Sequence, residues 1–163
     1  MIKLNIIQEQ IERARELYPF DSLKGSITEG GSNIYGALGE IMIYDWSKLK
    51  TEDVDFNSTY DYDMIIKGRR VDIKTKKTTV VPKPFYLCSI SAFNSKQDCD
   101  HYIFTRIDES LKVGYILGYI SKKRFFKDAA FKKKGELDIN GWTFKDDCYN
   151  IEVSKLTQFK TLA

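Results

Sequence analysis

Residues 60–79 read YDYDMIIKGRRVDIKTKKTT, and this stretch decides the fold. Two runs that suit β-strands, residues 60–67 and 70–79, are joined at Gly68-Arg69. A connection of two residues that contains glycine is typical of a tight β-hairpin. The sequence therefore predicts two paired strands here, and the rest of the chain is interpreted outward from them.

The acidic and basic side chains of this hairpin are expected to share one face. Successive side chains of a strand alternate between its two faces, so Asp72 and Lys74 point the same way. With a two-residue loop, paired positions add up to an odd number, and Asp63 then projects on that face too. A three-residue loop or a bulge would break this parity, so the placement of Asp63 depends on the turn.

Two carboxylates and an ammonium group on one face suggest a metal site. Asp63 and Asp72 would repel each other, and a divalent cation between them would remove that repulsion. Mg²⁺ suits hard oxygen ligands, takes one or two carboxylates and keeps several waters. Such a cation lowers the pKa of a bound water and stabilises charge that grows on a phosphate. Lys74 could orient or deprotonate the attacking water and offset negative charge in the transition state.

A third carboxylate comes from the helix that precedes the hairpin. Asn33 is a suitable N-cap for a helix over residues 33–49. Gly36 and Gly39 lie inside this helix although each costs roughly 1 kcal/mol there, which indicates close approach of another group to the helix backbone. Glu40 lies off the apolar stripe beside these glycines, so its carboxylate could reach the end of the sheet where the metal would sit.

The remaining periodicity predicts an α+β layout of helix, helix, a block of strands, helix and a closing strand. Besides residues 33–49, helices are expected over residues 5–17 and 121–133. Besides the hairpin, strands are expected over residues 85–93, 101–107, 111–120 and 148–153.

Four segments in this order resemble the PD-(D/E)XK nuclease superfamily. They are residues 36–40 (GALGE), 60–66 (YDYDMII), 71–76 (VDIKTK) and 99–104 (CDHYIF). The pattern of that superfamily is a glutamate on a helix, an aspartate that opens a strand, and (D/E)-x-K on the next strand. With the basic helix that follows, the resemblance covers roughly residues 33–131.

The resemblance implies a restriction-endonuclease-like core, a central mixed β-sheet flanked by helices, and metal-dependent hydrolysis of DNA phosphodiester bonds. Asp63 and Asp72 would bind Mg²⁺, for which Mn²⁺ would substitute. Lys74 would be the catalytic lysine, and Glu40 would bind a second metal or position water. The sequence departs from the pattern in having Tyr62, not proline, before the first aspartate. Asp61 lies on the same strand face as Asp63 and remains an alternative to it.

Clustered cations suggest a footprint for nucleic acid, although the net charge is only +3. Basic residues dominate residues 67–83 and 122–134, where Asp72 and Asp128 are the acids. Solvated charged faces are the alternative interpretation of both runs. The residues predicted to bind nucleic acid are Arg69, Arg70, Lys76 and Lys77.

Length and composition describe a globular domain: 163 residues, 42% hydrophobic and 30% charged, interpreted as one domain over residues 1–163. No run approaches the ~18 apolar residues that span a bilayer, so no membrane is expected. Three cysteines and one histidine form neither a zinc pattern nor a disulfide framework, which favours a reducing, cytoplasmic setting. A homodimer is expected if both DNA strands are cut. The main alternative is a catalytically inactive nucleic-acid-binding protein with the same fold.

Overall fold

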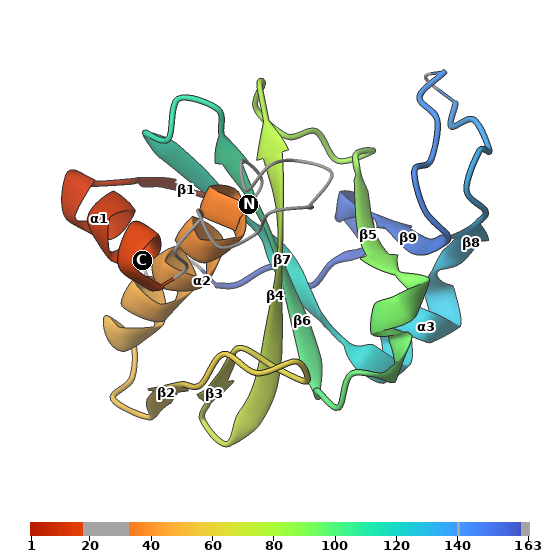
Figure 1. Cartoon of the computed structure of the whole chain (residues 1–163). Coiled ribbons are helices and arrows are strands. Elements are labelled where there is room, and N and C mark those ends of the chain that lie inside the picture. The colour runs from red at the N-terminus through yellow and green to blue at the C-terminus, as the bar shows by residue number, and fades with distance from the viewer. Residues whose placement is uncertain (18–32, 140, 161–163) are drawn as a thin grey trace.

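The computed structural model describes residues 1–17, 33–139 and 141–160 (Figure 1). The chain is α+β, with a six-stranded sheet and a separate three-stranded sheet. The elements, with η for a short 3₁₀ helix, are β1 Ile2–Asn5, α1 Gln8–Leu17, α2 Asn33–Lys48, β2 Val54–Phe56, β3 Met64–Ile66, β4 Arg69–Thr78, β5 Leu87–Ser91, η2 Ala92–Lys96, β6 His101–Asp108, β7 Val113–Ser121, α3 Lys122–Asp128, β8 Ala130–Lys132, β9 Cys148–Glu152 and η3 Val153–Lys155.

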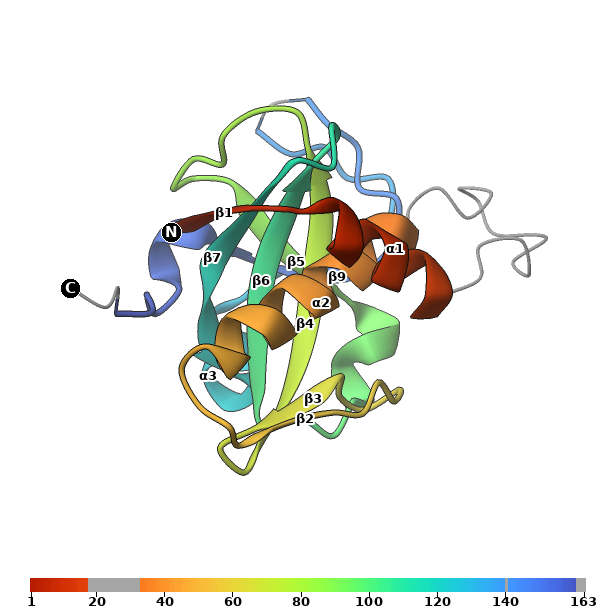
Figure 2. The same cartoon turned by 90° about the vertical axis from the view of Figure 1, so that its left-hand side faces the viewer.

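The larger sheet has the strand order β1-β7-β6-β4-β3-β2. It is mixed because β4 and β6 run parallel, whereas the other neighbours pair antiparallel. Helices α1 and α2 cover one face of this sheet, and the β5-β9-β8 sheet with α3 lies on the other (Figures 1 and 2). The α+β class and the mixed central sheet that the sequence predicts are confirmed.

Helix α2 packs closely on the larger sheet, and Gly39 makes this possible. A Cβ atom at Gly39 would lie 2.0 Å from Thr75 Oγ1 on β4. The predicted close approach is therefore confirmed at Gly39. A Cβ atom at Gly36 would meet nothing within 4 Å among the described residues, so close packing does not explain that glycine. The α2 side chains Leu38 and Ile41 are almost fully buried in the core between helix and sheet.

The opposite face of the sheet carries a second apolar core, rich in aromatic rings. Tyr102 and Phe104 on β6 contact Phe125 of α3, with ring centroids 5.6 and 5.9 Å apart. All three side chains are buried. This core joins β6 and β7 of the larger sheet to the β5-β9-β8 sheet.

The predicted hairpin is present, with its turn one residue earlier than expected. Lys67 and Gly68 form the two-residue loop, and both have positive φ, 49° and 73°. Positive φ at both central positions is the requirement of a type I′ turn, which matches the twist of paired strands. Met64 pairs with Val71 and Ile66 with Arg69, so paired positions add up to an odd number, as the parity prediction requires.

Two edge strands and one helix end differ from the predictions. The strands β1 and β2 have four and three residues, too few for an alternating pattern to stand out in the sequence. The helix predicted over residues 121–133 ends at Asp128, because Ala129 is already extended (φ −72°, ψ 146°). Phe131 then lies on β8, where its ring contacts Tyr149 of β9 at 5.2 Å. Pairing with a distant strand outweighs the helical pattern there.

Among the described residues, no helix is long and apolar enough to cross a membrane.

Candidate active site

Asp63 directly precedes β3 and lies near Asp72 of the neighbouring strand β4, close enough for the charge of Asp72 to affect it. The Asp63 N–H donates to the carbonyl oxygen of Val71 at 2.9 Å, although Val71 already pairs with Met64, so the regular register ends at Met64. The shared face of Asp63 and Asp72, which requires an unbroken register, stays a prediction. Both side chains are buried, with 7% and 3% of their residue surface exposed. The structure thus brings the two predicted ligands together.

The site forms where β4 continues past the end of β3. β4 pairs with β3 over only three residues but with β6 over residues 71–78. The backbone N–H of Ile73, on the side that β3 no longer covers, donates instead to Asp63 Oδ2 at 2.7 Å. A carboxylate therefore takes the place of the missing strand and is held rigidly against β4.

Lys74 and Gln97 complete the polar cluster around Asp72. Lys74 Nζ lies 2.7 Å from Asp72 Oδ2 and donates to Gln97 Oε1 at 3.2 Å. Gln97 Nε2 in turn donates to Asp72 Oδ1 at 3.2 Å and to the carbonyl oxygen of Tyr60 at 2.6 Å. Gln97 is buried and follows η2. Sequence reasoning missed it, because no pattern distinguishes it from other amides in loops.

Burial and neighbouring carboxylates raise the pKa of Asp63. It lies at about 8, raised chiefly by burial and then by the negative charges of Glu40 and Asp72. The Ile73 N–H and Lys74 act in the opposite direction. Glu40 is partly buried on α2 and lies near enough to affect Asp63 electrostatically. The structure therefore brings all four predicted catalytic residues into one region.

Asp72 is buried with a cation as its main compensation. Burial raises its pKa, while the Lys74 ammonium group and the hydrogen bond from Gln97 lower it. Asp72 Oδ2 is buried and forms the ion pair with Lys74 Nζ at 2.7 Å, without a hydrogen bond of good geometry from the described residues. A hard cation at this oxygen would have to share it with Lys74 or displace the ammonium group.

The donor set suits a cation that keeps several waters. Among the described residues, no group of three or more His, Cys, Asp or Glu side chains is arranged to hold a metal ion. Asp63 and Asp72 could supply two carboxylate ligands, which is the number that Mg²⁺ commonly takes from protein. The set does not suit Zn²⁺, which requires three or four protein ligands.

Asp61, the alternative first ligand, is engaged elsewhere. Its Oδ1 accepts the backbone N–H of Asp98 at 3.0 Å. This hydrogen bond ties the segment before Asp63 to the loop that carries Gln97. The placement favours Asp63 over Asp61 as the partner of Asp72.

The two arginines predicted to bind nucleic acid lie at the hairpin end of β4. Arg69 is exposed. Arg70 is paired with Asp98 at 2.6 Å and with Asp100 at 3.3 Å, and its backbone N–H also donates to Asp100. Because two acids already satisfy its guanidinium, Arg70 holds the loop beside Gln97 and offers little free charge to phosphate.

The two lysines of the same prediction lie near the other end of β4 and point to opposite faces. Lys77 is exposed and lies 3.8 Å from Glu109. Lys76 shares a face with Lys74, and its Nζ donates to Ser89 Oγ on β5 at 2.8 Å. Seven residues separate Arg69 from Lys76, roughly 23 Å of extended strand. The four residues therefore do not form one patch.

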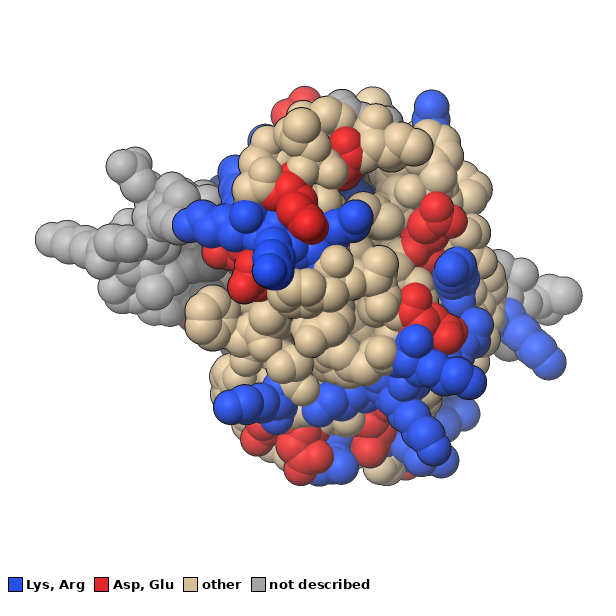
Figure 3. Space-filling view, turned by 90° about the vertical axis from the view of Figure 1, so that its right-hand side faces the viewer, with Lys and Arg blue, Asp and Glu red and all other residues tan. Residues whose placement is uncertain are grey.

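Lys and Arg side chains also gather over the lower part of the face formed by β5, β8, β9 and α3, where Asp and Glu lie between them (Figure 3). In α3, Arg124 pairs with Asp128 at 3.5 Å. This surface is mixed in charge, as the solvated interpretation expects.

No protein-family model matches this chain, and no curated protein matches it either.

Proposed function

We propose that the chain is a Mg²⁺-dependent DNA endonuclease with a restriction-endonuclease-like core. The observation that carries the proposal is the burial of Asp63 near Asp72, with Lys74 held between Asp72 and Gln97. Two carboxylates and a lysine on adjoining strands, with a glutamate from a helix, are the set that the sequence resemblance implies for phosphodiester hydrolysis. Restriction, homing, junction-resolving and repair roles would all use this set.

Asp63 and Asp72 would hold the metal, and Glu40 would bind a second ion or a water. A bound Mg²⁺ or Mn²⁺ would activate water and neutralise charge on the scissile phosphate. The raised pKa of Asp63 supports a cation site, because buried carboxylates that repel one another are relieved by a bound cation.

Lys74 would orient the attacking water and stabilise the phosphoryl oxygens in the transition state. Its Nζ is fixed by Asp72 and Gln97, so the ammonium group does not have to be ordered during the reaction. Gln97 fixes both Asp72 and Lys74, which makes it a positioning residue.

A second candidate, an inactive nucleic-acid-binding protein, is favoured by one observation. The ion pair at 2.7 Å between Lys74 and Asp72 already neutralises one carboxylate without a metal. Such a protein would bind DNA in a salt-sensitive way and leave it intact.

For double-strand cleavage we further propose a homodimer, since one chain presents one such site among its described residues.

A cytoplasmic location is proposed because Cys88, Cys99 and Cys148 are free thiols.

Cleavage of supercoiled plasmid and branched DNA tests the proposal. Wild type, Asp72→Asn and Lys74→Met are compared with Mg²⁺, Mn²⁺ or EDTA. Asp55→Asn, an exposed change on β2, is the matched control. We expect metal-dependent cutting by wild type and control, with at least a 100-fold loss in both site variants. Intact substrate in every reaction, with DNA binding retained, would instead establish the inactive binding protein.

A further inference from the structure

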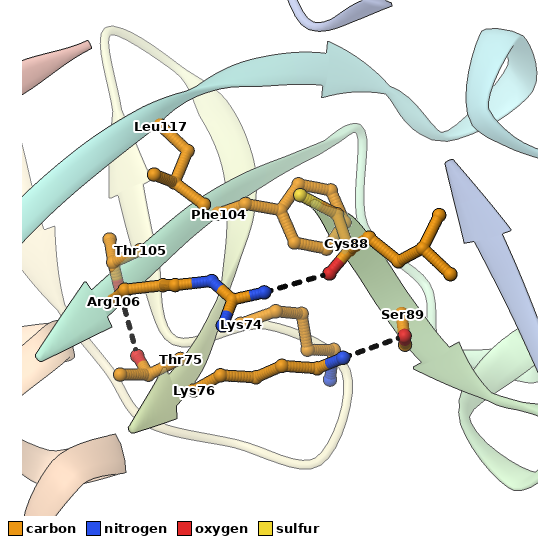
Figure 4. A pocket seen from close by; sticks show the side chains of 10 residues that line it. Lys74, Thr75, Lys76, Cys88, Ser89, Phe104, Thr105, Arg106 and Leu117 are labelled. Atoms are coloured by element: carbon orange, nitrogen blue, oxygen red, sulfur yellow. Dashed lines mark hydrogen bonds between the residues drawn. The ribbon is translucent and has the colours of Figure 1, made fainter. Parts of the chain in front are cut away.

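A pocket of about 100 Å³ lies next to the candidate active site, between β4 and β6 of the larger sheet and β5 of the smaller one (Figure 4). It is far larger than the ~10–15 Å³ that a single water needs. The charged residues of its lining are Lys74, Lys76 and Arg106, and Ser89 is one of its neutral polar residues. Lys76 and Arg106 are both partly buried, so solvent reaches the pocket.

Two cations of this pocket face each other without an acid. Lys76 and Arg106 are register partners on the parallel strands β4 and β6. Neither takes part in an ion pair within the described part of the chain. Lys76 Nζ donates to the neutral Ser89 hydroxyl, and one Arg106 amino group donates to the carbonyl oxygen of Leu87 at 3.1 Å. The Arg106 guanidinium also lies over the Tyr86 ring, 5.1 Å from its centroid. Arg106 Nε is buried and has no hydrogen-bond partner.

This arrangement disfavours the charged forms of Lys76 and Arg106. The pKa of Lys76 is lowered to about 8, chiefly by burial and then by the charge of the adjacent Arg106. The neighbouring Cys88 thiol supplies no compensating charge at neutral pH, because burial raises its pKa to about 12. Unpaired cations in a partly desolvated site are costly unless an anion binds there.

We propose that this pocket binds a phosphate group. A tetrahedral oxyanion would accept hydrogen bonds from Lys76 Nζ and Arg106 Nε, and it would satisfy the orphaned donor. Ser89 Oγ, which donates to Asn150 Oδ1, would hold Lys76 Nζ in place rather than contact the anion. Lys74 and Lys76 lie on one face of β4, roughly 7 Å apart along the strand. This spacing is comparable to that of neighbouring phosphates in one nucleic-acid strand. If the proposed nuclease function holds, the pocket therefore receives the phosphate next to the scissile one.

Calorimetric titration with inorganic phosphate tests the pocket itself. It is done in EDTA, against sodium chloride at matched ionic strength, so that neither metal nor cleavage contributes. We expect wild type to bind phosphate, with at least tenfold weaker binding in Lys76→Met and Arg106→Gln and a smaller loss in Ser89→Ala. The control is Lys3→Met, which removes an exposed charge from the edge strand β1. No binding by folded wild type, or equal binding by all variants, would overturn the proposal.

Oligonucleotides distinguish the source of the phosphate. Affinities for strands with a 5′-phosphate, a 3′-phosphate or neither are measured in EDTA for wild type and Lys76→Met. A preference for one phosphorylated end that Lys76→Met abolishes identifies a terminal phosphate. If Lys76→Met weakens binding of all three oligonucleotides equally, the pocket holds an internal phosphodiester. If Lys76→Met binds all three oligonucleotides as tightly as wild type but no longer binds inorganic phosphate, the pocket holds free phosphate. If the protein binds phosphate but does not cut DNA under any condition, the proposal of a phosphate pocket holds and the proposal of nuclease activity fails.

Discussion

Asp63 is a residue whose charge depends strongly on its surroundings. Its folded-state pKa of about 8 lies above the ordinary value of 3.8, mainly because the carboxyl group is buried. The folded chain therefore holds a proton that the unfolded chain has lost between these two values. Without metal, the contribution of Asp63 to the free energy of unfolding is therefore most favourable below about pH 4, and it falls as the pH rises towards 8.

Replacing Asp63 by asparagine should remove this dependence. The amide oxygen can still accept the Ile73 N–H, and the buried charge is gone. We expect Asp63→Asn to be more stable than wild type at pH 8 in EDTA by on the order of 2 kcal/mol, and nearly equal at pH 4. Urea unfolding at both pH values measures this difference. A wild type with the same stability at both pH values would contradict the assignment of the raised pKa.

Lys76 presents the opposite case, a base whose folded-state pKa is lowered. Its charge is opposed by burial and by Arg106, with Lys74 in the same pocket and the Cys88 and Cys148 thiols nearby. The lowered pKa makes the unfolded chain bind the extra proton between about pH 10 and 8, so stability falls as the pH drops through that range.

We therefore expect Lys76→Met to melt a few degrees higher than wild type at pH 7 without phosphate, since ~1 kcal/mol shifts the midpoint by about 2–4 °C in a chain of this size. Phosphate should raise the melting temperature of wild type and leave that of the variant unchanged. Thermal melts with and without phosphate measure both effects. A variant that melts lower than wild type in both buffers would show that Lys76 is mainly structural.

At the scale of elements, contact between α2 and β4 sets the distance from Glu40 to the aspartates. Gly39→Ala would drive a methyl group into Thr75 Oγ1, at 2.0 Å, whereas Gly36→Ala would enter open space. We expect Gly39→Ala to destabilise the fold by about 1–3 kcal/mol and Gly36→Ala to be neutral or stabilising by up to ~1 kcal/mol. Chemical denaturation of the two variants measures this difference. Equal free energies of unfolding would contradict the observed helix–sheet contact.

Local patterns predicted the site better than they predicted what surrounds it. The shared face of Asp72 and Lys74 follows from a period of two, and the hairpin follows from a two-residue turn, both visible within twenty residues. The hydrogen bond from the Asp63 N–H to Val71 departs from the hairpin register, and no local pattern predicts it. Gln97 and the phosphate pocket depend on a loop and a second sheet. In that sheet Ser89 pairs with Asn150, 61 positions away. No periodicity reports such a pairing, so the sequence could not assign Lys76 to a pocket.

At the scale of the whole molecule, cations differ in whether an acid already pairs with them. Arg70 is paired with Asp98 and Asp100, whereas Lys76 takes part in no ion pair among the described residues. DNA binding should therefore depend more on Lys76 than on Arg70. We expect Lys76→Met to reduce the slope of log K against log salt by about one unit, and Arg70→Met to change it much less. Binding titrations in EDTA at several salt concentrations measure the slopes. A larger effect of Arg70 would mean that its pairs with Asp98 and Asp100 open on DNA.

The claim on which the whole account depends is that Asp63 and Asp72 together form a divalent-metal site. Mn²⁺ titration followed by electron paramagnetic resonance tests it without DNA and without activity. At pH 8 we expect wild type and the control Asp55→Asn to bind Mn²⁺, with Mg²⁺ as a competitor, and Asp63→Asn and Asp72→Asn to bind it at least tenfold more weakly. Mn²⁺ binding that is absent from wild type, or equal in all four proteins, would contradict the account.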